Sequence, residues 1–119
     1  MKIEISSFAD AGNYQNERLV IKVQSDIDIG EYAVFCSAVS TEGDPTSGRK
    51  NAYWFPDGSV KSGDLVVLYT KRGTTSTKKL TGARTAHFYY WGEEKALWGS
   101  ADNAAVLLSI DEWNYEIPK

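Results

Sequence analysis

Apolar and polar residues alternate in short runs along the chain, and turn-forming residues separate these runs. KIEIS near the N-terminus alternates with period two, which is typical of a strand that buries one face. LVIKVQ, DLVVLYT and TAHFYYWG are rich in β-branched and aromatic residues and predict further strands. EYAVFCSAV is apolar almost throughout, and the turn-rich loop 40–51 behind it favours a strand buried on both faces. About seven strands are predicted, at the spacing of an all-β sandwich or barrel.

Residues 100–108 allow two interpretations. Ser100 could cap a helix, because the alanines and leucines that follow favour one. A strand over residues 104–110, followed by a turn at residues 111–112, fits the same residues equally well. WNYEI alternates with period two, so it is predicted to be a strand with Trp113, Tyr115 and Ile117 on one face.

Length and composition predict a single domain over residues 1–119. A chain of 119 residues that is 42% hydrophobic and 24% charged can bury about two thirds of its unfolded surface, which excludes disorder. No run is apolar enough for a signal peptide or a membrane span, so we expect a cytoplasmic protein without membrane insertion. A domain cut from a larger secreted protein would show the same pattern. Cys36 is the only cysteine, which excludes an intramolecular disulfide.

Charge is distributed unevenly around a net charge of −3. Residues 49–84 hold eight basic and two acidic residues, whereas residues 93–116 hold six acidic residues and one lysine. The candidate contacts for an anion or a nucleic acid are Lys71, Arg72, Lys78, Lys79 and Arg84. The simpler interpretation, favoured by the acidic isoelectric point, is that these residues keep an exposed hairpin soluble and protect its edge.

Aromatic residues are concentrated between residues 88 and 113. Most of them are expected in the core, because a sandwich of this size needs large apolar side chains there. Alternation places Tyr89 and Trp91 on one face of their strand and Phe88 and Tyr90 on the other. Both faces are equally buried only in a central strand, so one face is expected to be half exposed. We predict Tyr89 and Trp91 as contacts for a partner.

No set of residues predicts catalysis, a metal site or a cofactor. His87 is the only histidine and has no clustered carboxylates around it in sequence, so a structural role is expected. Cys36 lies in an apolar run, which favours an inert thiol. Asp26 and Asp28 share a strand face but lack the surroundings of a catalytic pair or the spacing of a calcium loop. We therefore predict no enzyme activity and no small-molecule substrate.

Residues from about 18 to 113 resemble the lamin tail domain, the immunoglobulin-like module of nuclear lamins and of many bacterial proteins. The resemblance rests on the order of ERLVIKV, DIDIGEYAV, WFPDGSVKSGDLVVLYT and WGEEKALWGSADNAAVLLSIDEW. Three positions depart from the family pattern: Tyr32 follows Gly30-Glu31, Ser62 replaces a proline, and Asp111-Glu112 replaces an aspartate-glycine turn. The resemblance implies an immunoglobulin-like β-sandwich of about seven or more strands. It also implies that residues 104–110 form a strand.

For function, the resemblance implies a module without catalysis that contacts proteins or DNA. Our leading hypothesis is a binding module that contacts a protein partner, or its own copy, through exposed aromatic residues and strand edges. The alternative is a nucleic-acid-binding module that uses the basic loop at residues 71–84. A carbohydrate-binding sandwich that uses tryptophan platforms is the third hypothesis.

Overall fold

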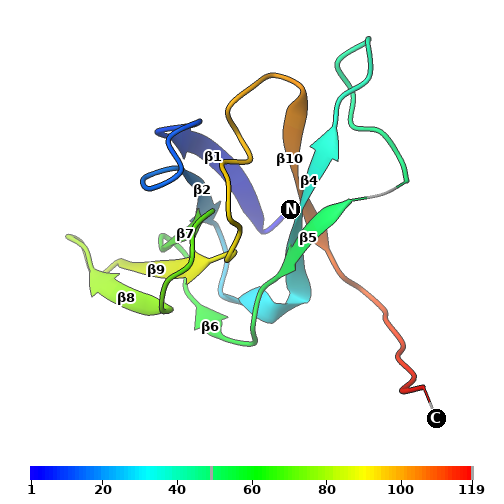
Figure 1. Cartoon of the computed structure of the whole chain (residues 1–119). Helices are drawn as coiled ribbons and strands as arrows, with labels where there is room; N and C mark the ends of the chain where they lie inside the picture. The colour runs from blue at the N-terminus through cyan, green and yellow to red at the C-terminus, as the bar shows by residue number, and fades with distance from the viewer. Residues whose placement is uncertain (49, 119) are drawn as a thin grey trace.

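The computed structural model describes residues 1–48 and 50–118, and within them it forms ten strands and one short 3-10 turn (Figure 1). The strands are β1 (Ile3–Ala9), β2 (Arg18–Val23), β3 (Ile27–Asp28), β4 (Tyr32–Ala38), β5 (Asn51–Trp54), β6 (Ser59–Val60), β7 (Leu65–Tyr69), β8 (Ser76–Lys79), β9 (Thr85–Tyr90) and β10 (Asn103–Ser109). The 3-10 turn, η1 (Ile29–Glu31), joins β3 to β4. The prediction of a nearly all-β fold is confirmed.

Two larger sheets make up most of the structure. One has five strands in the order β1-β2-β7-β9-β8, and the other has three in the order β10-β4-β5. All neighbouring pairs are antiparallel except β7 and β9, which run parallel. β3 and β6 form a separate two-stranded ribbon. In Figure 1 the five-stranded sheet lies on the left and the three-stranded sheet on the right.

The core lies between the two sheets. Alternate residues of the central strands, such as Leu19 and Ile21 of β2, are fully buried, as period-two patterning requires. From the opposite sheet, Val34 of β4 is also fully buried in the same cluster. The rings of Phe55 and Tyr89 meet edge to face with their centroids 5.1 Å apart and join the two layers. The described residues therefore share one hydrophobic core.

Residues 103–109 form a strand, so the helical interpretation of this segment is wrong. β10 pairs along its whole length with β4, and residues from Asn103 opposite Ala38 to Ser109 opposite Tyr32 are in continuous register. A long ladder satisfies the backbone groups of the segment and outweighs the modest helix preference of its alanines and leucines. No helix in the described ranges is long and apolar enough to cross a bilayer.

The prediction of a strand at WNYEI is wrong, because residues 113–117 form no strand. Residues 110–118 leave the domain in an extended path without a partner strand (Figure 1). The amide of Ile110 donates to the carbonyl of Glu31 at 2.7 Å, and Trp113 packs on Trp54 with ring centroids 5.1 Å apart. Alternation produces a strand only where another strand accepts its hydrogen bonds, and this segment lies beyond the end of its sheet.

Gly30 is expected to tolerate no side chain. A Cβ atom built there would lie 2.8 Å from the Cα of Asp57, so the clash involves backbone that cannot swing away. Gly30→Ala should therefore lower the free energy of unfolding by about 2 kcal/mol, measured by urea denaturation. Gly58→Ala is the matched control in the same region, because its Cβ would meet only ordinary contacts at 3.8 Å. Equal losses of unfolding free energy in the two variants would show that the close approach at Gly30 does not limit side-chain size there.

Candidate functional site

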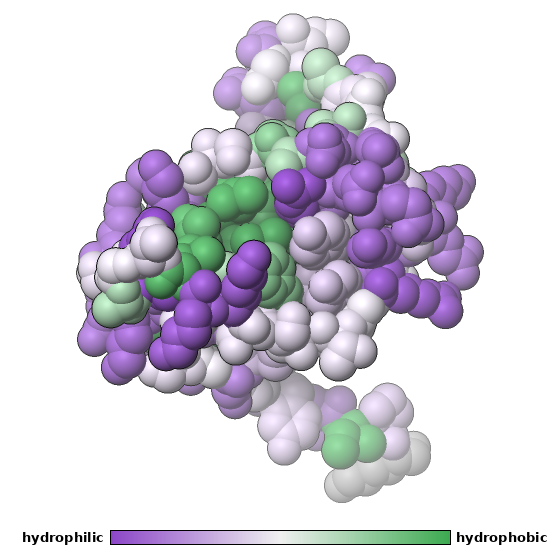
Figure 2. Space-filling model, turned by 90° about the vertical axis from the view of Figure 1, so that its left-hand side faces the viewer, coloured by the Kyte–Doolittle hydropathy of each residue, from purple (hydrophilic) through white to green (hydrophobic). Residues whose placement is uncertain are grey.

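The outer face of the five-stranded sheet, which points away from the core, carries a continuous apolar surface. Strand register places Val20, Val67 and Phe88 side by side across β2, β7 and β9. The same register places Leu65 beside Ala86 in the next row. Figure 2, viewed from the side of this sheet, shows apolar side chains gathered together and surrounded by hydrophilic ones. We call Val20, Leu65, Val67, Ala86 and Phe88 the apolar patch.

The centre of the apolar patch is buried although no second layer of the described residues covers it. Val67 is only 6% exposed, because its cross-strand neighbours Val20 and Phe88 flank it. Val20, Leu65 and Phe88 are half-buried. Apolar side chains that already exclude water from one another lose little mobility on binding, so such a surface favours contact with another apolar face.

Aromatic residues and cations extend this surface at one end. Tyr69 stacks on Tyr90, with ring centroids 5.2 Å apart and an interplanar angle of 11°. The guanidinium of Arg18 lies 5.8 Å from the centroid of the Tyr69 ring, and the ammonium of Lys71 lies 5.3 Å from it. Cations over aromatic faces hold the rings in place. Arg18 also pairs with Asp10 at 2.8 Å, so Lys71 is the one of these two cations that adds unpaired positive charge among the described residues.

Two lysines and one glutamate lie at the rim of the apolar patch. Register places Lys22 beside Leu65 and Lys78 beside Ala86, so both lysines point to the outer side. Both are exposed, and neither forms an ion pair with any residue that the structure describes. Glu4 lies opposite Lys22 on β1 and accepts a hydrogen bond from Gln24 at 2.8 Å. The outer face therefore combines apolar, aromatic and cationic groups.

Of the predicted contact residues, Tyr89 lies on the other face of β9, and Trp91 follows directly after the strand. Tyr89 is 5% exposed and packs in the core, so its assignment as a partner contact is wrong. Trp91 is half-buried and packs against Tyr53 and Trp98. Alternation separated the two faces of β9 correctly, but the three-stranded sheet covers the face that we predicted to be exposed. Phe88 and Tyr90 occupy the face that stays partly open.

The predicted basic residues do not form one site. Lys78 and Lys79 are successive residues of β8, so their side chains point to opposite sides of the sheet. Arg72 lies 3.4 Å from the carboxylate of Glu94, and Arg84 donates to the carbonyl of Thr81 at 3.2 Å. Lys71 lies over Tyr69, as described above. Only some of these cations contribute to the outer face, and Lys22, which does, falls outside the predicted loop.

Glu17 is a buried hub that sequence reasoning missed. Its carboxylate is fully buried and accepts hydrogen bonds from the amides of Gly12, Leu97 and Trp98 and from the hydroxyl of Thr70. These donors come from the turn between β1 and β2, the end of β7 and the long segment before β10. Because all its oxygens are occupied by the protein, Glu17 organises the fold and offers no group to a ligand.

Asp64 and His87 form a second polar cluster, between the start of β7 and β9. His87 Nε2 lies 2.8 Å from Asp64 Oδ2, and the carboxylate also accepts from the amides of Lys61 and Thr85 at 3.0 Å. Burial alone would raise the pKa of Asp64, but hydrogen bonds from His87 and from the two amides outweigh burial and lower that pKa. These bonds tie the turn before β7 to β9, which is a structural role.

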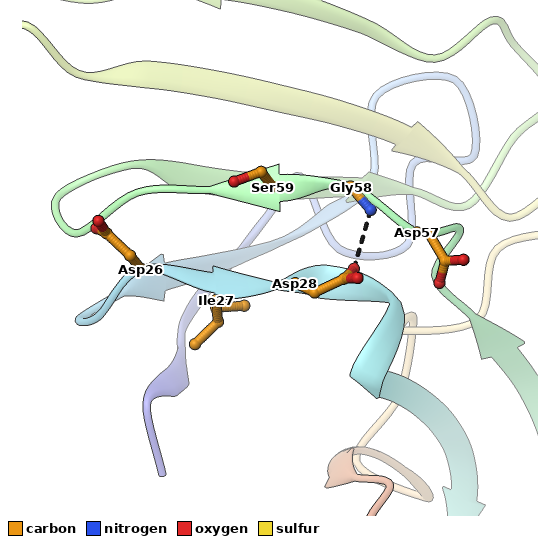
Figure 3. A pocket seen from close by; sticks show the side chains of 6 residues that line it. All are labelled: Asp26, Ile27, Asp28, Asp57, Gly58 and Ser59. Atoms are coloured by element: carbon orange, nitrogen blue, oxygen red, sulfur yellow. Dashed lines mark hydrogen bonds between the residues drawn. The ribbon is translucent and has the colours of Figure 1, made fainter.

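An acidic hollow lies beside the β3–β6 ribbon (Figure 3). Asp26, Asp28 and Asp57 line it, but Asp28 accepts from the amides of Gly58 at 2.9 Å and Gly30 at 2.8 Å. These two backbone hydrogen bonds lower the pKa of Asp28. Asp26 accepts from the amide of Ser62 at 2.9 Å. Within residues 1–48 and 50–118, no group of three or more His, Cys, Asp or Glu residues is arranged to hold a metal ion.

Cys36 and His87, the only cysteine and the only histidine, lie in different sheets. Cys36 lies on β4 in the three-stranded sheet, whereas His87 lies on β9 in the five-stranded sheet and is engaged by Asp64. Burial, followed by the nearby charges of Glu93 and Glu17, raises the pKa of the Cys36 thiol, which disfavours a nucleophilic thiolate.

A smaller apolar groove lies between the edge strands β1 and β10. Ile3, Ile5, Pro45, Ala105 and Leu107 line it. Among the described residues Glu4 is its charged side chain, and its lining includes no lysine or arginine, unlike the rim of the apolar patch.

No known family model matches the chain, and a search of curated proteins finds no significant match.

Proposed function

We propose that this protein is a non-catalytic interaction module that binds a protein partner on the outer face of its five-stranded sheet. The observation that carries the proposal is the apolar patch, with Val67 at its centre and the cations Lys22 and Lys78 at its rim. Apolar area supplies affinity in protein interfaces, and rim charges select the partner and speed association.

The chemistry of the outer face indicates the kind of partner. A partner segment should present aliphatic or aromatic side chains to the apolar patch and carboxylates to its rim. The stacked pair Tyr69 and Tyr90 offers a rigid aromatic surface at one end, which suits an aromatic residue of the partner. We therefore propose an acidic segment that contains large apolar residues.

We also propose that the fold is of the lamin-tail, immunoglobulin-like type. The all-β architecture, with one mixed and one antiparallel sheet around one core, supports this assignment. The strand at residues 103–109 supports it as well, because the resemblance implies a strand in this segment. A contact module without enzymatic activity is the function that such a resemblance implies.

The nucleic-acid hypothesis receives less support than the protein-partner hypothesis. Lys78 and Lys79 point to opposite faces, and Arg72 lies beside Glu94, so the basic loop presents no continuous track for a phosphate backbone. The carbohydrate hypothesis needs exposed tryptophan platforms. Trp91 and Trp98 are partly or fully covered. Trp54 and Trp113 are 49% and 63% exposed, but their rings meet edge to face and so form no single flat platform.

A direct binding experiment tests the proposal. A fluorescent peptide that alternates glutamate with leucine and phenylalanine is titrated with the protein, beside a lysine version, duplex DNA and a glucan oligosaccharide. We expect the acidic peptide to bind, and Lys22→Glu/Lys78→Glu to weaken that binding about tenfold or more, because the rim charge is reversed. Both side chains are exposed, so the variant should stay folded.

Lys61→Glu/Lys95→Glu is the matched control, since it changes net charge equally at exposed positions away from the register of the outer face. Equal weakening by both variants would indicate a general charge effect rather than a site. Binding of duplex DNA that weakens steeply with salt, without binding of the acidic peptide, would overturn the proposal in favour of the nucleic-acid hypothesis.

A further inference from the structure

The C-terminal segment at residues 111–118 exposes three large apolar side chains. Trp113, Tyr115 and Ile117 are 63%, 70% and 72% exposed. They alternate with polar residues, so an extended backbone places all three on one side. Side chains of this size are rarely left exposed together on a soluble domain unless they contact something else. We call residues 111–118 the tail.

The tail has the chemistry that the outer face requires. Besides the three apolar residues it carries Asp111, Glu112 and Glu116 and no basic residue, so its side chains contribute a charge of −3. The outer face offers the apolar patch and the cations Lys22 and Lys78. Charge and apolarity are therefore complementary between the tail and the outer face.

The tail cannot easily reach the outer face of its own chain. It starts where β10 ends, and Trp113 packs on Trp54 of β5, so it leaves along the three-stranded sheet. The outer face belongs to the other sheet, on the opposite side of the domain (Figure 1). As described, the tail points away from that sheet, so the outer face that it can meet is that of a second copy (Figure 1).

We infer that the tail of one copy binds the outer face of the five-stranded sheet of another copy. The inference rests on the proposed function and names its partner as a second copy of this chain. Because the tail and the outer face are different surfaces, the contact is heterologous and links copies head to tail. Association then continues into chains or closes into a ring, according to the angle between neighbours.

Charge reversal followed by mixing tests this contact in the full chain. Lys22→Glu/Lys78→Glu gives an acidic face beside an acidic tail, and Glu112→Lys/Glu116→Lys gives a basic tail beside a basic face. In sedimentation velocity we expect the native chain to associate with rising concentration and each variant alone to associate about tenfold more weakly or not at all. An equimolar mixture of the two variants restores opposite charges at each contact and should associate again.

The control is Glu42→Lys/Asp44→Lys, which changes net charge equally in an exposed loop and should leave association unchanged. A native chain that stays monomeric, or variants that fail to associate when mixed, would overturn the inference. If association is lost in Trp113→Ala/Tyr115→Ala/Ile117→Ala but survives Lys22→Glu/Lys78→Glu, the tail binds another surface and the assignment is wrong. If the acidic peptide still binds the outer face while the native chain is monomeric, the inference fails alone and the proposed function stands.

Discussion

Replacing Glu17 with alanine is expected to lower the free energy of unfolding by about 3–5 kcal/mol, because several buried donors lose their acceptor at about 1–3 kcal/mol each. The variant loses one buried carboxylate and leaves the amides of Gly12, Leu97 and Trp98 without their acceptor. A buried donor without a partner carries its full desolvation penalty. Urea unfolding followed by tryptophan fluorescence measures the effect.

The loss should also have a local signature. Glu17 holds the segment before β10 through two amides, so hydrogen exchange at Leu97 and Trp98 should become faster than at the centre of β7. Thr70→Val is the matched control, because it removes a single donor to the same carboxylate and should cost only about 1 kcal/mol. A loss in Glu17→Ala no larger than in the control would contradict the role of Glu17 as a hub.

Asp64→Ala is expected to cost about 3 kcal/mol at neutral pH. The aspartate side chain is 5% exposed and joins His87 to the amides of Lys61 and Thr85, so its removal leaves three groups without their partner. Thermal or urea unfolding at pH 7 measures the loss. Asp26→Ala is the control, since Asp26 also accepts from an amide but is exposed, and we expect a smaller effect there.

The contribution of Asp64 should depend on pH in a defined direction. The pKa of Asp64 is lowered in the folded protein, so the unfolded chain binds more protons as the solution becomes acidic. The stability difference between the native chain and Asp64→Asn should be complete above about pH 4 and shrink as the pH falls through the lowered folded pKa. The comparison with Asp64→Asn is needed because the pKa of Asp28 is also lowered, so Asp28 too makes the native chain less stable as the pH falls. A constant difference down to strongly acidic pH would contradict the lowered pKa of the Asp64 carboxylate.

Most strands could be predicted from local patterning, and the reasons for the failures are physical. β1, β2, β4, β7 and β9 follow directly from alternation and β-branched content. Residues 103–109 were ambiguous because local preference allowed a helix, and only pairing with β4 decides for a strand. WNYEI has the same alternation but extends past the sheet, so it stays unpaired. Whether another strand is available is a property of the whole fold and cannot be read from a short segment.

The candidate site was harder to predict than the fold. Alternation separates Phe88 and Tyr90 from Tyr89 and Trp91, but only the packing of two sheets decides which set is covered. The parallel pairing of β7 with β9 then places Val67 beside Phe88, although they are far apart in sequence. The role of Glu17 was hard to predict for the same reason, because its partners at residues 97 and 98 lie about 80 positions away. One signal was available: apolar residues occupy both faces of DLVVLYT, which indicates a strand with an apolar outer side as well.

The most direct test of the outer face as a binding surface is to map the acidic peptide on the 15N-labelled protein by NMR chemical shifts. We predict that the largest changes fall on backbone amides of β2, β7 and β9 around Val20, Val67 and Phe88, and that they disappear in Lys22→Glu/Lys78→Glu. Changes that instead gather along the groove between β1 and β10 would contradict the account. Changes around the acidic hollow of Asp26 and Asp57 would contradict it as well.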